Sequence, residues 1–101
     1  MEKTNYRSTN LIIQTILEGI IKAEKDKFNP KKGIVKSHLI KFCGLKQVTA
    51  EKYLSKLENA EYISSHTEKW GDREINMYEI TQKGRERYNW FVMINTEMEE
   101  S

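Results

Sequence analysis

The chain has 101 residues, of which 38% are hydrophobic and 32% are charged, and its formal net charge is +2. This length suits one domain over residues 1–101, and no stretch approaches the ~18 apolar residues that span a bilayer. The first ten residues, MEKTNYRSTN, lack the apolar segment of a signal peptide. The single cysteine, Cys43, excludes an internal disulfide framework. We therefore expect a cytoplasmic protein with no membrane segment, no metal and no other cofactor.

The small net charge is made of three unequal segments. Residues 1–26 carry four basic and four acidic side chains, whereas residues 27–56 carry eight lysines and only one acid, Glu51. Residues 57–101 carry five basic and ten acidic side chains, so the middle segment is +7 and the last is −5. A basic block in a nearly neutral chain indicates a surface that faces a polyanion. The alternative is a solvated face that keeps a small domain soluble.

The first predicted element is a helix over residues 10–25, which Ser8 or Thr9 can cap. Pro30 marks the loop that follows it. The apolar residues of this helix cover an arc of roughly 180°, which is wider than a single core-facing stripe. We therefore expect the helix to lie between two packing partners. The residues of this arc are Ile12, Ile13, Ile16, Leu17, Ile20 and Ile21.

Two shorter helices are predicted next, over residues 34–43 and 47–59. Gly44 suits the end of the first, because glycine often follows a helix C-terminus. In the second, Ala50, Leu54 and Leu57 recur at helical spacing and are expected to point inward. The short turn that joins the two helices, residues 44–46, predicts a helix-turn-helix arrangement.

Beyond residue 61 the apolar period changes from that of a helix to that of a strand. Residues 62–81 predict a β-hairpin, in which Gly71 and Asp72 supply turn chemistry. Thr81 can then cap a last helix over residues 82–98. This helix contains five consecutive apolar residues, WFVMI at 90–94. A domain of this size rarely buries such a helix on all sides. Either it meets its copy in a homodimer, or it packs with helix 10–25 inside one protomer.

The order of these elements predicts a mainly α fold with a β-hairpin (α+β), a winged helix-turn-helix with an added C-terminal helix. The stretch LKQVTAEKYLSKL at 45–57, followed by Tyr62 and Ile63, resembles the recognition helix and first wing strand of small archaeal-type winged-helix regulators. YEITQKG at 78–84 is similar to that family's pattern at the hairpin exit. Between helix 47–59 and the wing, where the family often has glycine, this chain departs from the pattern with Ala60 and Glu61. The resemblance covers residues 10–98 and implies DNA binding and, as in the small Sulfolobus DNA-binding proteins, dimerisation through the last helix.

These predictions define candidate site residues. A helix that enters the major groove would use its outward residues, and the Gln47 amide suits an adenine edge. Lysines at the start of helix 34–43 suit phosphates, and so do cations of the wing, although Glu68, Asp72 and Glu74 surround them. The candidate DNA contacts are Lys46, Gln47, Thr49, Lys52, Ser55 and Lys56 on the recognition helix, Lys32, Lys36 and Ser37 before it, and Lys69 and Arg73 on the wing. The candidate dimer contacts are Ile13, Ile16, Tyr88, Trp90, Phe91, Val92, Ile94 and Met98.

We therefore expect a double-stranded-DNA-binding protein, a dimeric transcriptional regulator that reads the major groove with helix 47–59. Two alternatives remain open, a non-specific chromatin-type binder and a winged helix used for protein–protein contacts. An enzyme is not expected. His38 and Cys43 lie five residues apart, and no third group is recognisable that would orient them.

Overall fold

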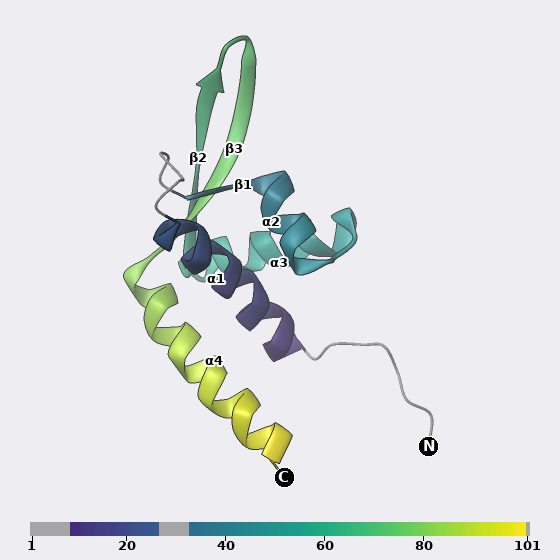
Figure 1. The fold of residues 1–101 in the computed structure, drawn as a ribbon, viewed down its shortest axis with the longest axis vertical. Coiled ribbons are helices and arrows are strands. Elements are labelled where there is room, and N and C mark those ends of the chain that lie inside the picture. Colours follow the sequence, from purple (N-terminus) through teal and green to yellow (C-terminus); the bar gives the residue numbers. More distant parts are fainter. Residues whose placement is uncertain (1–8, 27–32, 101) are drawn as a thin grey trace.

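The computed structural model describes residues 9–26 and 33–100 (Figure 1). Within these ranges four helices surround the base of a long hairpin, which projects at the opposite end of the molecule from the C-terminus of α4. The α+β class predicted from the sequence is confirmed. The elements in chain order are α1 Thr9–Lys25, β1 Ile34–Val35, α2 Lys36–Cys43, α3 Gln47–Asn59, β2 Ile63–Trp70, β3 Arg73–Ile80 and α4 Gln82–Glu100.

Helix α1 packs against both α2 and α4, as its wide apolar arc predicts. It begins one residue earlier than expected, at Thr9, and ends at Lys25 as expected. Its side chains Ile16, Leu17 and Ile20 are fully buried and occupy the centre of the core. The core therefore lies between α1, the two short helices and the base of the sheet.

Helices α2 and α3 form the expected helix-turn-helix. Gly44 ends α2 in the left-handed conformation, with φ 66°, and its N–H donates to the Ile40 carbonyl at 3.1 Å. Glycine adopts this conformation at little cost, so the chain can turn sharply into α3. On α3 the expected inward residues Ala50, Leu54 and Leu57 are buried, at 1–2% exposure.

Residues Ile34 and Val35 do not start α2, as the sequence pattern suggested, but form the short strand β1. This strand pairs antiparallel with β3, with Ile34 opposite Tyr78 and Val35 opposite Met77. Both are β-branched and suit a strand. Gly33 before them has φ 91°, and a Cβ at this position would lie 2.4 Å from the Tyr78 carbonyl oxygen. The close approach of Gly33 to β3 favours pairing over helix extension, and the sheet has the order β1-β3-β2.

The hairpin and the last helix follow the expected pattern closely. Strands β2 and β3 pair along their whole length, from Ile63 opposite Ile80 to Trp70 opposite Arg73. The Oγ1 of Thr81 accepts a hydrogen bond from the Gly84 N–H at 3.0 Å, so Thr81 caps α4 as predicted. Helix α4 then continues to Glu100, two residues past the expected end. No helix in the described part of the chain is long and apolar enough to cross a bilayer.

Candidate nucleic-acid interface

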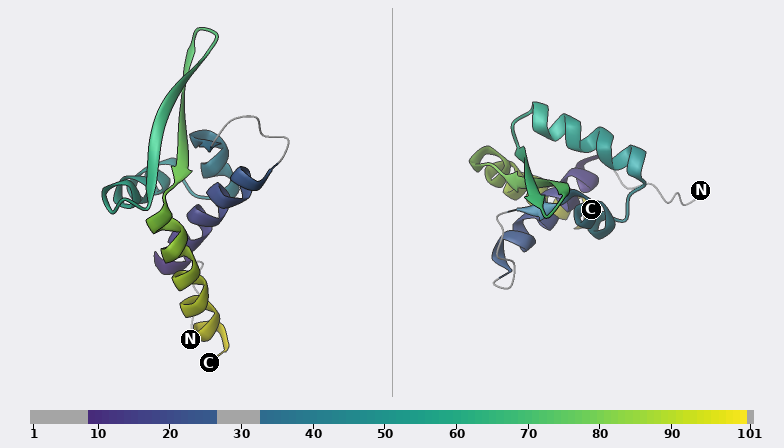
Figure 2. Two further views of the ribbon diagram at one scale, coloured as in Figure 1. Left: turned by 90° about the vertical axis from the view of Figure 1, so that its left-hand side faces the viewer. Right: turned by 90° about the horizontal axis from the view of Figure 1, so that it is seen from above.

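The exposed side of α3 forms a ridge of four residues, Val48, Lys52, Ser55 and Asn59. They are spaced i, i+4, i+7 and i+11, so they lie one above another, and all four are exposed. At 100° per residue this ridge is opposite the buried side of the helix. Figure 2 shows α3 along the periphery of the molecule, where another molecule could reach this ridge. We call these four residues the α3 ridge.

Gln47 lies beside the α3 ridge, on the flank that faces α2 and the hairpin. Its Nε2 donates a hydrogen bond to Glu51 Oε2 at 2.6 Å. Lys36 Nζ, from the first residue of α2, lies 3.4 Å from Glu51 Oε1. These two partners, with the Gln47 bond as the larger cause, lower the pKa of Glu51 below its usual range. The one acid in the basic segment is thus ionised at neutral pH and already paired with two candidate DNA contacts.

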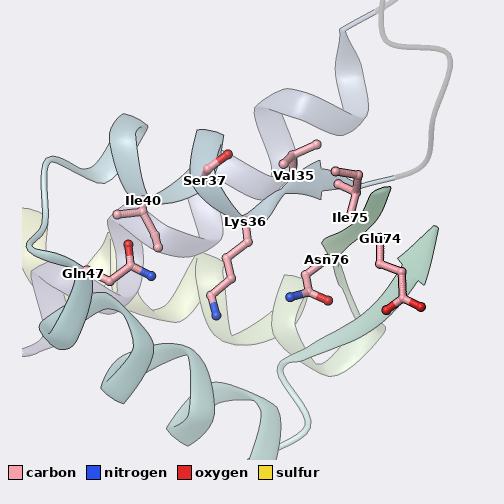
Figure 3. A pocket seen from close by; sticks show the side chains of 8 residues that line it. All are labelled: Val35, Lys36, Ser37, Ile40, Gln47, Glu74, Ile75 and Asn76. Carbon is pink, nitrogen blue, oxygen red and sulfur yellow. The ribbon is translucent and has the colours of Figure 1, made fainter. Parts of the chain in front are cut away.

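This flank borders an open hollow between the two short helices and the hairpin. Figure 3 shows Lys36 extending toward α3, with Gln47 on one side and Asn76 of β3 on the other. Ser37 and Glu74 also line this hollow. Val35, Ile40 and Ile75 complete its lining, so it is an open hollow of mixed polar and apolar character next to the α3 ridge.

The other predicted contacts of the helix-turn-helix are distributed around α3. Lys46, Lys52, Ser55 and Lys56 are exposed, whereas Thr49 is half-buried. The Lys56 ammonium group lies 5.7 Å from the centre of the Tyr53 ring. Lys32 falls outside the described residues.

The wing places its cations among acids, as the sequence suggested. Lys69 lies opposite Glu74 in the β2–β3 register, and the Trp70 indole donates to Glu68 Oε1 at 3.2 Å. His66 lies between two carboxylates, 3.1 Å from Glu68 and 3.3 Å from Glu79. Lys69 and Arg73 thus lie among acidic residues that repel phosphates, so the wing is a weaker candidate contact than the α3 ridge.

Polar contacts hold helix α4 against α1, but apolar side chains on the outer side of α4 remain exposed. Arg85 forms an ion pair with Glu24, and Asn95 Nδ2 donates to Gln14 Oε1 at 2.5 Å. The outer side chains of α4 include Trp90, which is 57% exposed. Helix α4 therefore packs against α1 within one protomer, and the side of α4 that faces away from α1 still exposes apolar side chains.

Two of the expected dimer contacts need correction. Ile16 is 1% exposed and Phe91 is 7% exposed, and both belong to the core of the protomer. Because the protomer's own core covers both side chains, neither offers a surface to a partner. The remaining candidates are half-buried or exposed: Ile13, Tyr88, Trp90, Val92, Ile94 and Met98. Met93, which the sequence prediction left out, is 63% exposed and lies on the same helix.

The residues considered for metal or catalytic chemistry are not brought together. His38 is exposed on α2, whereas Cys43 is buried in the core. In residues 9–26 and 33–100, no three His, Cys, Asp or Glu side chains are placed to hold a metal ion.

The helix-turn-helix, the three-stranded sheet and the appended α4 define a winged helix-turn-helix protein. Among solved structures, the chain is similar to the PcaV transcriptional regulator of Streptomyces coelicolor, with a TM-score of 0.72, 11% identity and coverage of 96% of this chain and 61% of that one. It is similar to a Staphylococcus aureus MepR variant bound to an oligodeoxyribonucleotide, with a TM-score of 0.65, 20% identity and coverage of 88% and 59%.

A third similar structure is Sso10a-2, a DNA-binding protein from Sulfolobus solfataricus. Its TM-score is 0.64 and its identity 28%, and the match covers 93% of this chain and 87% of that one. The chain thus spans about three fifths of the length of MepR and PcaV but nearly the full length of Sso10a-2. No family model and no curated protein sequence matches the chain. The likeness to solved structures shows the winged-helix fold.

Two features of the interface were not evident from the sequence. The i, i+4 spacing of Gln47 and Glu51 is a local signal for their hydrogen bond, but the approach of Lys36 comes from a separate helix. Val48 is not among the candidate contacts predicted from the sequence, yet it is 82% exposed. Its position opposite Ala50 and Leu54 on the helical wheel was the signal that could have placed it on the α3 ridge.

Proposed function

We propose that this protein is a double-stranded-DNA-binding transcriptional regulator without catalytic activity, which reads the major groove with α3 as a homodimer. The observation that carries the proposal is the α3 ridge, a row of four exposed side chains that includes the cation Lys52, on the second helix of a helix-turn-helix. An α-helix fits the major groove of B-form DNA, and lysines beside it neutralise phosphates. The residues proposed to contact DNA are those of the sequence prediction, with Lys46, Lys52, Ser55 and Lys56 foremost.

The solved structures that share the fold support this proposal. PcaV and MepR are described as transcription regulators, and Sso10a-2 as a DNA-binding protein. A regulator works where the genome is, so the cytoplasmic location belongs to the proposal. The relationship to small archaeal-type regulators is also part of the proposal, and the nearly full-length match to Sso10a-2 supports it.

The dimer would form through the uncovered side of α4. Trp90, Met93 and Met98 are the most exposed large apolar side chains of this helix, at 57–72%. Apolar side chains gathered on one helix favour association with a second copy, because association removes their surface from water. Two α3 helices would then enter half-sites about one helical turn, ~34 Å, or a multiple of it, apart.

The test is a selection of binding sites from random duplexes, followed by titration of the selected duplex at rising salt. Each phosphate contact contributes about −0.9 to the slope of log affinity against log salt. Lys52→Ala and Lys56→Ala should each make this slope less negative by roughly 1, while Lys83→Ala on α4 should leave it unchanged.

Two outcomes would overturn the proposal. Equal affinity for selected and unrelated duplexes would replace the regulator with a non-specific chromatin-type binder. Absence of binding to every duplex at about 50 mM salt would exclude a DNA-binding role, because phosphate contacts are strongest at low salt.

A further inference from the structure

Val48 is the most exposed large apolar side chain in the described part of the chain, at 82%. It is the second residue of α3 and stands at the N-terminal end of the α3 ridge. Valine also loses side-chain freedom in a helix, so it is a poorer choice at an exposed helical position than alanine or lysine. Neither packing nor helix propensity accounts for a valine here.

The surroundings of Val48 are polar and cationic. Its neighbours in the chain are Gln47 and Thr49, and Lys52 follows it on the α3 ridge. None of the other exposed large apolar side chains of the described residues lies on α3: Phe42 is on α2, Trp70 ends β2, and Trp90, Met93 and Met98 are on α4. A single apolar side chain among cations is too small for a protein interface core, which needs a cluster of apolar residues. It matches a small apolar group on an anionic molecule.

The major groove of DNA offers one such group. Each base pair presents hydrogen-bond donors and acceptors there, and only thymine adds an apolar substituent, its C5-methyl group. The polar reader expected at this end of the helix, Gln47, lies on the flank and donates to Glu51. This leaves Val48 as the side chain at the outermost position of the first turn of α3.

We infer that Val48 contacts the C5-methyl group of a thymine in each half-site and so determines the choice of base at that position. This inference rests on the proposed function, because it assumes that α3 enters the major groove. Removing one buried methyl group from such a contact weakens affinity by about three- to fivefold.

The experiment uses the duplex selected with the wild-type protein and replaces its thymines one at a time with 2′-deoxyuridine, which lacks only the methyl group. We expect one position in each half-site where this replacement weakens wild-type binding by about three- to fivefold. Val48→Ala should bind the thymine duplex as weakly as the wild type binds the deoxyuridine duplex, and should not distinguish the two bases.

Two variants serve as controls. Ser55→Ala, also on the α3 ridge, should retain the full deoxyuridine penalty at that position. Val48→Thr keeps the side-chain shape but replaces one methyl group with a hydroxyl, so it should show a smaller penalty than the wild type. Because Val48 is exposed, its substitution leaves the core intact. Thermal unfolding of both Val48 variants at or slightly above the wild-type temperature verifies this, since alanine favours the helix more than valine does.

The outcomes separate the inference from the proposed function. Tight, selective binding with no deoxyuridine penalty, or with the same penalty in Val48→Ala, overturns the contact and leaves the DNA-binding function standing. A selected site without thymine in either half does the same. Failure of the wild type to bind any duplex overturns both.

Discussion

Lys36 on the first turn of α2 and Glu51 on α3 form an ion pair, with 3.4 Å between Nζ and Oε1. Glu51 also accepts the hydrogen bond from Gln47. One carboxylate therefore occupies two side chains that could otherwise face DNA, and it places a negative charge beside the α3 ridge.

The substitution Glu51→Gln should strengthen DNA binding while keeping an acceptor for Gln47. It removes a charge that repels phosphates and frees Lys36 to neutralise one. We expect the slope of log affinity against log salt to become more negative by about 0.9. The matched control is Glu18→Gln, which removes a carboxylate paired with Lys22 on α1. An unchanged slope for Glu51→Gln would show that Lys36 makes no phosphate contact.

Gly84 is the last residue of the sequence YEITQKG at the hairpin exit, and its substitution should lower the free energy of unfolding. In most helices Gly→Ala is stabilising by up to about 1 kcal/mol. A Cβ at Gly84 would lie 2.1 Å from the Tyr62 carbonyl oxygen and 2.9 Å from Ile80 Cγ1. We expect Gly84→Ala to lower the free energy of unfolding by about 1–3 kcal/mol, measured by urea denaturation.

Gly19 supplies the comparison for Gly84. A Cβ there would meet side-chain atoms, at 2.8 Å on the partly exposed Phe42 and at 2.9 Å on the buried Leu39, whereas at Gly84 the nearest atom is a backbone oxygen that can shift less. Gly19→Ala should therefore cost less than Gly84→Ala. A stabilised Gly84→Ala variant would contradict the close contact with Tyr62.

Ile16→Ala tests the assignment of this residue to the core of the protomer. Because Ile16 is 1% exposed, truncation leaves a cavity and should lower the free energy of unfolding by about 2–5 kcal/mol. Urea denaturation measures the loss, and size-exclusion chromatography with light scattering measures the mass of the folded variant. A variant of normal stability that no longer associates would instead place Ile16 on a dimer surface.

Trp90→Glu should have the opposite profile. The exposed side chain contributes little to the protomer core, so the circular dichroism spectrum should stay unchanged, while a charge on the apolar side of α4 should dissociate the proposed dimer. Analytical ultracentrifugation at several concentrations reports the change in mass. Thr96→Glu adds the same charge at another exposed position of α4, away from Trp90 on the helical wheel, and should leave the mass unchanged. A dimer that survives Trp90→Glu argues against the α4 interface.

The environment of Tyr78 leads us to expect that the free energy of unfolding falls at alkaline pH. Burial, with smaller effects from Glu58 and Glu51, raises the pKa of its hydroxyl above the ordinary value. As pH rises, the Tyr78 hydroxyl therefore ionises in the unfolded chain before it ionises in the folded one. Its contribution to the free energy of unfolding is fully present below about pH 10 and is lost as pH rises through the folded pKa. Tyr78→Phe lacks this proton, so its urea midpoint should fall less than that of the wild type between about pH 8 and about pH 11. Equal falls would assign the alkaline loss to other groups.

The sequence was most informative where structure is local. The spacing of Ala50, Leu54 and Leu57 identified the buried side of α3, and Thr81 identified the start of α4. The strand β1 was missed because two β-branched residues are too short a signal, and their partners Tyr78 and Met77 lie far along the chain. The same limit applies to Ile16, because a wide apolar arc does not reveal which part faces the protomer's own helices.

The pairing of β1 with β3 also bears on how the chain folds. Between these strands in the sequence lie α2, α3 and β2, so the pairing closes a loop that contains the whole helix-turn-helix. Closing such a loop has an entropic cost that only long-range contacts offset. Helix α3 and the hairpin beside it are therefore expected to fold and unfold as one cooperative unit, with no intermediate in which the hairpin stands free of α2.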